Sequence, residues 1–245
     1  MNTGTEQGCI IYGDASIAYN VVYSHRKSVG ITVYPSGEVR VSAPSRMSHS
    51  EVRRLVAEKA RWIDKKLREF RAEGGRDATK KYVEGEAFFY LGKEYLLNFT
   101  AGDHGPLVTL GDSRLNVIIP PGIGDEKQTE LIRETVFEWY RFHAEMAIDQ
   151  ALNIYSPRLG ILPLHYKVKN LSKRWGSCTA QNLLNFNAKI VMAPREQLEY
   201  VVAHELCHVR VKDHSPRFWA LMGQVMPGYL PAKKALRKDG WKYEL

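Results

Sequence analysis

The sequence is poor in cysteine and has no long apolar run. Its three cysteines, Cys9, Cys178 and Cys207, are odd in number and far apart, so we expect neither a disulfide framework nor a paired-cysteine zinc motif. Isolated reduced thiols are typical of the cytoplasm, and we expect that location. The first residues, MNTGTEQG, lack the basic and apolar segments of a signal peptide. No apolar run reaches the length of a membrane span, so we expect no membrane-embedded segment.

Acidic residues are fewer than basic ones. The 245 residues include 27 Asp and Glu against 35 Lys and Arg, which gives a formal net charge of +8. This balance permits a nucleotide or a nucleic acid as partner, although a solvated basic surface is the commoner explanation. The sequence contains no P-loop and no carboxylate cluster suited to magnesium. A hydrophobic content of 44% is ordinary for a globular protein with a core.

What the sequence does contain is the pattern His204-Glu205-Leu206-Cys207-His208. Residues four apart lie on the same face of an α-helix, so His204 and His208 can hold one metal ion between them. Glu205 projects about 100° around the helix from His204 and can reach a water molecule on that metal. Apolar residues at helical spacing border the pattern, and polar side chains in such a place need partners. The pattern therefore predicts the helix of a zinc hydrolase, with Glu205 as general base.

A catalytic zinc usually has three protein ligands and one open position. His214 is the best third candidate, because Ser215 after it is suited to cap a following helix. Val211 stands where the metzincins have a glycine, and a turn with positive φ would be strained at this β-branched residue. Asp213 and Asp239 are weaker rivals. A thermolysin-like arrangement, with a glutamate on the following helix, finds no candidate in that segment.

Strand-like and helical patterns alternate along the chain. Residues 8–42 and 86–120 are rich in Val, Ile and Tyr, with turn signals between alternating runs, which predicts strands. One helix is expected from about residue 48 to 73 and a longer one from 125 to about 155. No internal repeat is evident.

The stretch from Pro120 to Gly124 is the best candidate for a domain boundary. We therefore expect a strand-rich N-terminal region at 1–122 and a catalytic domain at 123–245. Inside the second part, residues 182–190 are expected to border an edge strand. An extended substrate could pair with such an edge beside the metal.

Three segments make the H-E-x-x-H pattern more specific: RWGSC at 174–178, LNFNAKIVMAP at 184–194 and YVVAHELCHVRVKDHSPRFWALMGQVMPGY at 200–229. Together with N-terminal segments they resemble the YgjP-like zinc metallopeptidase family, which is related to the SprT and WLM groups. The likeness covers most of the chain. It implies an α+β fold, in which a zincin-like catalytic core with an H-E-x-x-H helix follows a strand-rich N-terminal region with one long helix. It also places the third ligand at His214.

The first functional hypothesis is a zinc-dependent peptidase acting on a peptide or protein substrate. Zinc held by three histidines would lower the pKa of a bound water toward about 7. Glu205 would take the proton of that water and deliver a proton to the leaving amine. A second electrophile would help, and the candidates for it or for a substrate contact are Arg174, Tyr229 and His165.

Three other functions compete with this one. A metal-dependent nucleotide phosphoanhydride hydrolase could bind phosphates through Lys173, Arg174, Lys189 and Arg217. Dependence on Mg²⁺ would distinguish it. A DNA-associated protease resembling the SprT group would bind DNA in a salt-sensitive way. A metal-stabilised binding module without activity would have no need of Glu205.

Overall fold

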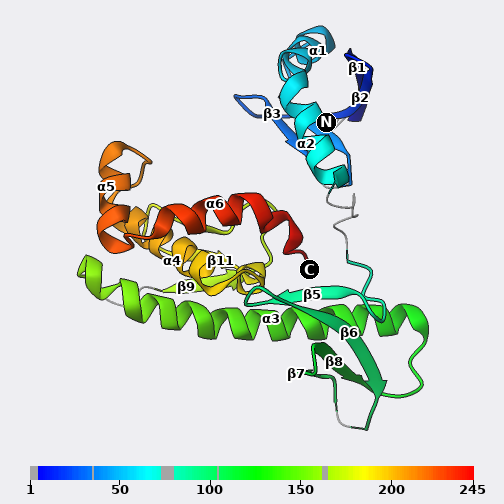
Figure 1. The fold of residues 1–245 in the computed structure, drawn as a ribbon, viewed down its shortest axis with the longest axis vertical. Helices are drawn as coiled ribbons and strands as arrows, with labels where there is room; N and C mark the ends of the chain where they lie inside the picture. Colours follow the sequence, from blue (N-terminus) through cyan, green and yellow to red (C-terminus); the bar gives the residue numbers. More distant parts are fainter. Residues whose placement is uncertain (1–4, 35, 73–79, 104, 162–164) are drawn as a thin grey trace. The chain divides into compact units, whose positions relative to one another are not determined.

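The computed structural model describes residues 5–34, 36–72, 80–103, 105–161 and 165–245 (Figure 1). It contains both β-sheets and α-helices, as expected for an α+β protein. The chain divides into two compact units, Met1–Ala78 and Thr79–Leu245. Among the described helices, none combines the length and the apolar character needed to cross a membrane.

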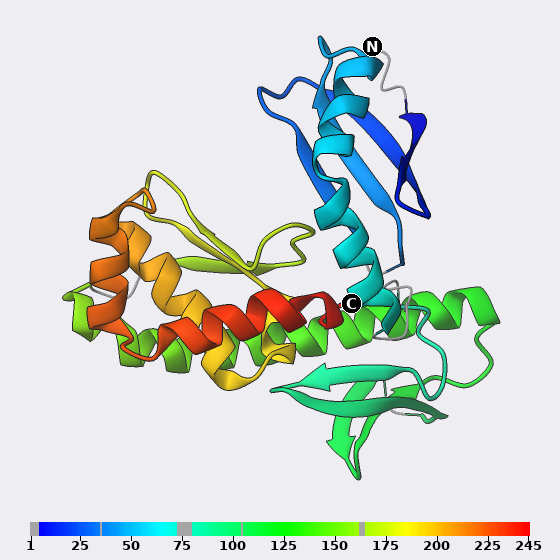
Figure 2. The same ribbon diagram turned by 45° about the horizontal axis from the view of Figure 1, so that its top comes forward.

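The first unit is a four-stranded sheet packed against two helices (Figure 2). Its strands are β1 (Thr5–Tyr12), β2 (Ala15–Ser24), β3 (Gly30–Val33) and β4 (Val39–Pro44), in the order β1-β2-β4-β3. The central pair, β2 and β4, is parallel, and the outer pairs are antiparallel. The strands β3 and β4 form an antiparallel hairpin, in which Ile31 pairs with Val41.

The core of the first unit follows from the two periods of its sequence. Ile17, Tyr19 and Val21 alternate along β2 and are at most 2% exposed, as expected for one buried face of a strand. They form a single cluster with apolar residues of α1 (His49–Glu58) and α2 (Ala60–Ala72). The sequence predicts one helix here, but the structure has two. The first helix ends at Glu58, and its C-cap Lys59 departs from helical geometry, with a φ of −98° and a ψ of 4°.

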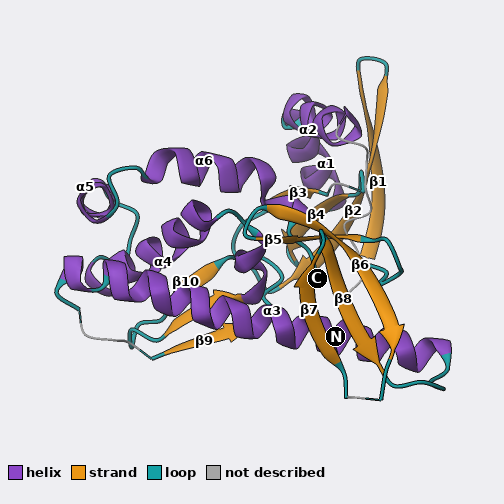
Figure 3. Ribbon diagram, turned by 60° about the horizontal axis from the view of Figure 1, so that its bottom comes forward, coloured by secondary structure: helices purple, strands orange, loops and turns teal. Residues whose placement is uncertain are grey.

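The second unit begins with another four-stranded sheet and continues into a helical part (Figures 1 and 3). The sheet contains β5 (Ala87–Tyr90), β6 (Lys93–Ala101), β7 (Leu107–Gly111) and β8 (Arg114–Ile119). Its order, β5-β6-β8-β7, with a parallel central pair, repeats that of the first unit. The two sheets therefore share one topology, although the sequence shows no internal repeat.

The long helix α3 (Asp125–Tyr155) runs along both the second sheet and the helices that follow it (Figure 3). Those later elements are η1 (Pro157–Leu159), β9 (Tyr166–Lys169), β10 (Gly176–Cys178), β11 (Leu184–Asn187), η2 (Ala188–Met192), α4 (Arg195–Arg210), α5 (Pro216–Val225), α6 (Tyr229–Asp239) and η3 (Gly240–Lys242). A single apolar cluster extends from the second sheet through α3 to α4, α5 and α6. The whole of the second unit thus shares one core.

The expected boundary at 122/123 falls inside this core, whereas the units divide at 78/79. Hydrogen bonds explain why the second sheet belongs to the later part. The backbone N–H groups of Leu91 and Gly92 donate to the carbonyls of Val191 and Met192, at 2.8 and 2.9 Å. In addition, the hydroxyl of Tyr140 on α3 donates to the carbonyl of Phe89 at 2.6 Å. These contacts hold the β5–β6 turn beside the segment that leads into α4.

The three-stranded sheet has the order β10-β11-β9, with β10 and β11 antiparallel and β11 and β9 parallel. Residues 182–190, which we expected to border an edge, include the central strand β11. The strand that packs against α4 is β10, and β10 is the outer strand of the sheet on that side. The edge beside α4 therefore belongs to the RWGSC segment.

Candidate metal and catalytic site

The helix α4 carries the H-E-x-x-H pattern, as the sequence predicts. Pro194 is its N-cap residue, and the helix ends at Arg210. At the next position Val211 is extended, with a φ of −134° and a ψ of 108°. This conformation suits a β-branched residue, so the strained turn that a glycine would otherwise relieve does not arise. The chain then reverses, and Ser215 is the N-cap of α5, again as predicted.

This reversal brings the three predicted histidine ligands together. The Nε2 atom of His214 lies 3.0 Å from Nε2 of His204 and 3.1 Å from Nε2 of His208. The candidate ligand atoms of all three residues lie within 4.8 Å of one another. Phe218 packs against each imidazole, with centroid distances of 4.9, 4.5 and 4.9 Å to His204, His208 and His214. An apolar residue of α5 thus supports the cluster.

The surroundings of His204 and His208 favour the neutral imidazole, which is the form that binds metal. Burial, with smaller contributions from the neighbouring His208 and His214, lowers the pKa of His204 to about 3. Burial also lowers the pKa of His208, against the raising effect of its hydrogen bond to Val211. That bond joins Nδ1 of His208 to the carbonyl oxygen of Val211 at 3.0 Å. A proton on Nδ1 leaves Nε2 of His208 free to bind a metal.

The donor set fits a metal ion such as zinc. Two nitrogen ligands at about 2.0–2.1 Å from a tetrahedral zinc would be about 3.3 Å apart. The separations of 3.0 and 3.1 Å in the cluster are close to that value. Three neutral imidazoles cannot all donate protons to one another, so a cation between them relieves the crowding of their lone pairs. The Nδ1 atom of His204 is buried and has no hydrogen-bond partner among the described residues.

Glu205 lies deep beside this cluster, with only 6% of its surface exposed. Burial raises the pKa of its carboxyl to about 7, against the lowering effect of Arg174. Its side chain also lies against the backbone of β10. A Cβ atom placed on Gly176 would be 2.7 Å from Cγ of Glu205, so a larger residue there would displace the carboxyl. Glycine within RWGSC is thus explained by close approach, a signal that we did not extract from the sequence.

The three candidates for a second electrophile or a substrate contact, Arg174, Tyr229 and His165, have different surroundings. Arg174 lies near enough to Glu205 for its positive charge to lower the pKa of that carboxyl. The ring of Tyr229 lies 5.8 Å from that of Trp219 and nearly parallel to it, and Trp219 lies 5.7 Å from the ring of His214. His165 precedes β9, on the side of the sheet away from β10, and among the described contacts its side chain has none with the histidines.

The rival third ligands have other partners. A carboxylate oxygen of Asp213 accepts a hydrogen bond from the backbone N–H of Ser215 at 3.0 Å. Asp239 forms an ion pair with Lys242 at 2.9 Å. Neither belongs to the group of residues whose ligand atoms converge.

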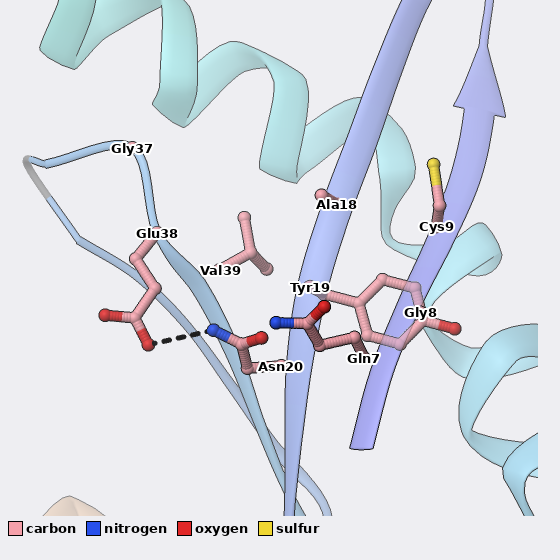
Figure 4. A pocket seen from close by; sticks show the side chains of 9 residues that line it. All are labelled: Gln7, Gly8, Cys9, Ala18, Tyr19, Asn20, Gly37, Glu38 and Val39. Atoms are coloured by element: carbon pink, nitrogen blue, oxygen red, sulfur yellow. Dashed lines mark hydrogen bonds between the residues drawn. The ribbon is translucent and has the colours of Figure 1, made fainter. Parts of the chain in front are cut away.

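Among the described residues, two pockets stand apart from the histidine cluster. One, of about 540 Å³, lies on the first unit, where Gln7, Asn20 and Glu38 are among its lining residues (Figure 4). Asn20 donates a hydrogen bond of 3.5 Å to Glu38 there. This pocket contains none of the predicted site residues. The other, of about 380 Å³, lies between η1, the end of α4 and α5.

Comparison with known proteins identifies the family of this chain. The YgjP-like metallopeptidase domain matches residues 27–239. Among solved structures, the chain is similar to the metallopeptidase zymogen of Pyrococcus abyssi abylysin, with 17% identity and a TM-score of 0.34. That similarity covers 42% of this chain and 99% of the other. No curated protein matches the chain. On the match across residues 27–239, the chain belongs to the YgjP-like metallopeptidase family.

Proposed function

We propose that this protein is a zinc-dependent peptidase of zincin type. Its metal ligands would be His204, His208 and His214, and Glu205 would be the general base. The observation that carries the proposal is the convergence of three imidazole nitrogens beside one buried carboxyl. The family membership supports a peptidase-type hydrolase. The second unit, Thr79–Leu245, would be the catalytic domain.

Zinc, when bound, would polarise the scissile carbonyl and make the attacking water more acidic. The work of Glu205 is to move a proton. Its raised pKa of about 7 places the carboxyl where it can accept a proton from water and then give one to the leaving amine. Gly176 lets the carboxyl lie against β10, which fixes the position of the base.

The outer edge of β10 is a place where substrate can bind. An extended peptide can add to a sheet edge through main-chain hydrogen bonds, which position it independently of its side chains. Because β10 packs against α4, such a peptide would lie beside Glu205. Arg174, two residues before this strand, and Tyr229, beside Trp219, are then the candidates to stabilise negative charge on the carbonyl oxygen.

We also propose a reducing compartment such as the cytoplasm. The described cysteines, Cys9, Cys178 and Cys207, are all free. Reduced thiols persist where glutathione and thioredoxin act.

The test is hydrolysis of a fluorogenic peptide library by the wild type and two variants of α4. Glu205→Gln should retain its metal but lose at least about 100-fold in turnover, the scale of general base catalysis. Glu196→Gln makes the same chemical change at an exposed position of the same helix and should be near wild type. Undiminished turnover in Glu205→Gln would contradict the mechanism.

The contacts give less support to a nucleotide hydrolase. Lys189, one of the residues that we expected to bind phosphate, is 6% exposed and forms an ion pair with Glu244 at 2.6 Å. Arg217 lines the 380 Å³ pocket between η1, α4 and α5. Activity on nucleoside triphosphates that depends on Mg²⁺, without activity on peptides, would nevertheless favour that function.

A further inference from the structure

The pocket of about 380 Å³ between η1, the end of α4 and α5 has an unusual combination of lining residues. Three are arginines, Arg158, Arg210 and Arg217, and each comes from a different one of these elements. The others are four apolar residues and one amide: Leu159, Val211, Ala220, Leu221 and Gln224. No acidic residue lines the pocket.

Two of the arginines are held in place by backbone carbonyls. Nη1 of Arg158 donates a hydrogen bond to the carbonyl oxygen of Val225 at 2.8 Å. The guanidinium of Arg158 also lies 4.8 Å from the centre of the Tyr155 ring. Nη2 of Arg210 donates to the carbonyls of Leu159 and Gly160 at 2.9 and 3.3 Å. Fixed side chains lose little freedom when a ligand binds, which favours affinity.

These bonds use only part of the donor capacity of the arginines. Each guanidinium has five N–H donors, and the described contacts involve one terminal nitrogen each in Arg158 and Arg210. None of the three forms an ion pair among the described residues, although the charge of Arg217 contributes to lowering the pKa of Asp213. Three like charges around one pocket repel one another unless an anion joins them. A carboxylate is the anion whose two oxygens match the fork of a guanidinium.

The apolar lining narrows the class of ligand. On α5, positions 217, 220, 221 and 224 share one helical face, so the charge of Arg217 and the apolar surface of Leu221 lie side by side. Leu159 and Val211, 8% and 9% exposed, complete an apolar wall. An inorganic ion would leave this wall in contact with water, whereas a carboxylate attached to an apolar group would cover it. The amide of Gln224 can bond to a peptide group.

We propose that this pocket binds the free C-terminal carboxylate of a peptide whose last side chain is apolar. The three arginines would hold the carboxylate, and Leu159, Val211 and Leu221 would contact the side chain. Its size is at the lower end of the range of about 300–1,000 Å³ found for small-molecule pockets. The pocket is separate from the histidine cluster but adjacent to it, since Val211 also accepts the hydrogen bond from His208. The proposal needs no bound metal and does not depend on peptidase activity.

The test uses the full chain treated with a chelator, so that no peptide is cleaved, and isothermal titration calorimetry. The probes are acetyl-Ala-Ala-Leu with a free carboxylate and the same peptide with a C-terminal amide. We expect the acid to bind at least about tenfold more tightly than the amide, because charge-assisted bonds are the stronger ones. Equal binding of the two peptides, or no binding of the acid, would overturn the proposal.

Two variants locate the binding. Arg217→Gln removes an arginine for which no described hydrogen bond or ion pair exists, so the fold should be retained, and binding of the acid should weaken at least about tenfold. Arg237→Gln makes the same change on α6, outside the pocket, and should bind as the wild type does. Unchanged affinity in Arg217→Gln, or tighter binding of inorganic phosphate than of the acid peptide, would contradict a carboxylate pocket there. If Arg217→Gln fails to fold, the comparison of the acid and amide peptides on the wild type still tests the proposal.

Discussion

The two four-stranded sheets have the same strand order but different partners. The first, β1-β2-β4-β3, forms its own core with α1 and α2. The second, β5-β6-β8-β7, forms one core with α3 and with the helices that carry the histidines. Topology alone therefore does not make a sheet an independent unit. A sheet belongs to the unit whose residues pack against its buried face and bond to its turns.

The largest effect expected from this difference concerns truncation. Residues 79–245 should fold alone and bind zinc, whereas residues 123–245 should not fold. The shorter fragment lacks Phe88, Leu97, Leu115 and Val117, each at most 1% exposed. At about 2 kcal/mol for each buried side chain, their loss is comparable to the whole stability of a domain. Circular dichroism and thermal melting of both fragments would check this, and a cooperative melt of 123–245 would contradict the account.

The next effect is a pH dependence that Glu205 gives to the second unit. In metal-free protein, Glu205 keeps its proton up to a pH of about 7 when folded, whereas the unfolded chain ionises near 4.5. The stability of the folded state therefore falls as pH rises from about 4.5 to 7 and then stays lower, by up to about 3 kcal/mol. Glu205→Gln should lack this loss and be the more stable protein above pH 7.

Urea unfolding at several pH values, with a chelator present, measures that difference. His204 and His208 titrate in both proteins, so subtracting the two curves isolates Glu205. A difference that does not grow between pH 4.5 and 7 would show that the carboxyl is not buried as described.

A matched pair of core substitutions tests whether the two units have independent cores. Val41 of β4 and Val117 of β8 are both 0% exposed. Changing either to Ala should cost about 2 kcal/mol through lost burial and the cavity that remains. Only Val117→Ala should lower the melting transition that zinc raises, because only β8 shares a core with the histidine helices. Calorimetry with and without zinc would show this; a shift of that transition by Val41→Ala would mean that the cores are coupled.

The smallest effects concern two hairpin turns. Gly13 joins β1 to β2 with a φ of +56° and has nothing within 4 Å of an added Cβ. Gly92 joins β5 to β6 with a φ of +80°, and an added Cβ would lie 2.8 Å from Cγ of Pro194. Replacement by Ala should cost about 1 kcal/mol at Gly13, from backbone strain alone, and more at Gly92, where the clash adds to it. Equal losses of unfolding free energy would argue against the contact with Pro194.

The sequence predicts much of the candidate site because the relevant signals are local. The spacing of His204 and His208 on one helix, and of Ser215 before α5, depends only on helical geometry. The structure brings His214 to the other two histidines, with Val211 extended at the end of α4. By contrast, the close approach of Glu205 to Gly176 joins segments that are 29 positions apart, and no local pattern signals it.

The domain boundary could not be predicted for a similar reason. Pro120 to Gly124 is a strong turn signal, but a turn reports only a change of direction. Membership of a core depends on contacts between distant segments, such as Phe89 with Tyr140 and Leu91 with Val191. The alternating pattern of 86–120 is the same whether its buried face meets α1 and α2 or α3.

We propose that His204, His208 and His214 hold one metal ion. Elemental analysis of the purified full chain beside two histidine variants tests this proposal. We predict about one zinc per chain in the wild type and in His165→Ala, which alters an exposed histidine outside the cluster. His214→Ala should lose most of its zinc, because a site of two histidines binds more weakly than one of three. Equal zinc in His214→Ala and in the wild type would contradict the three-histidine site.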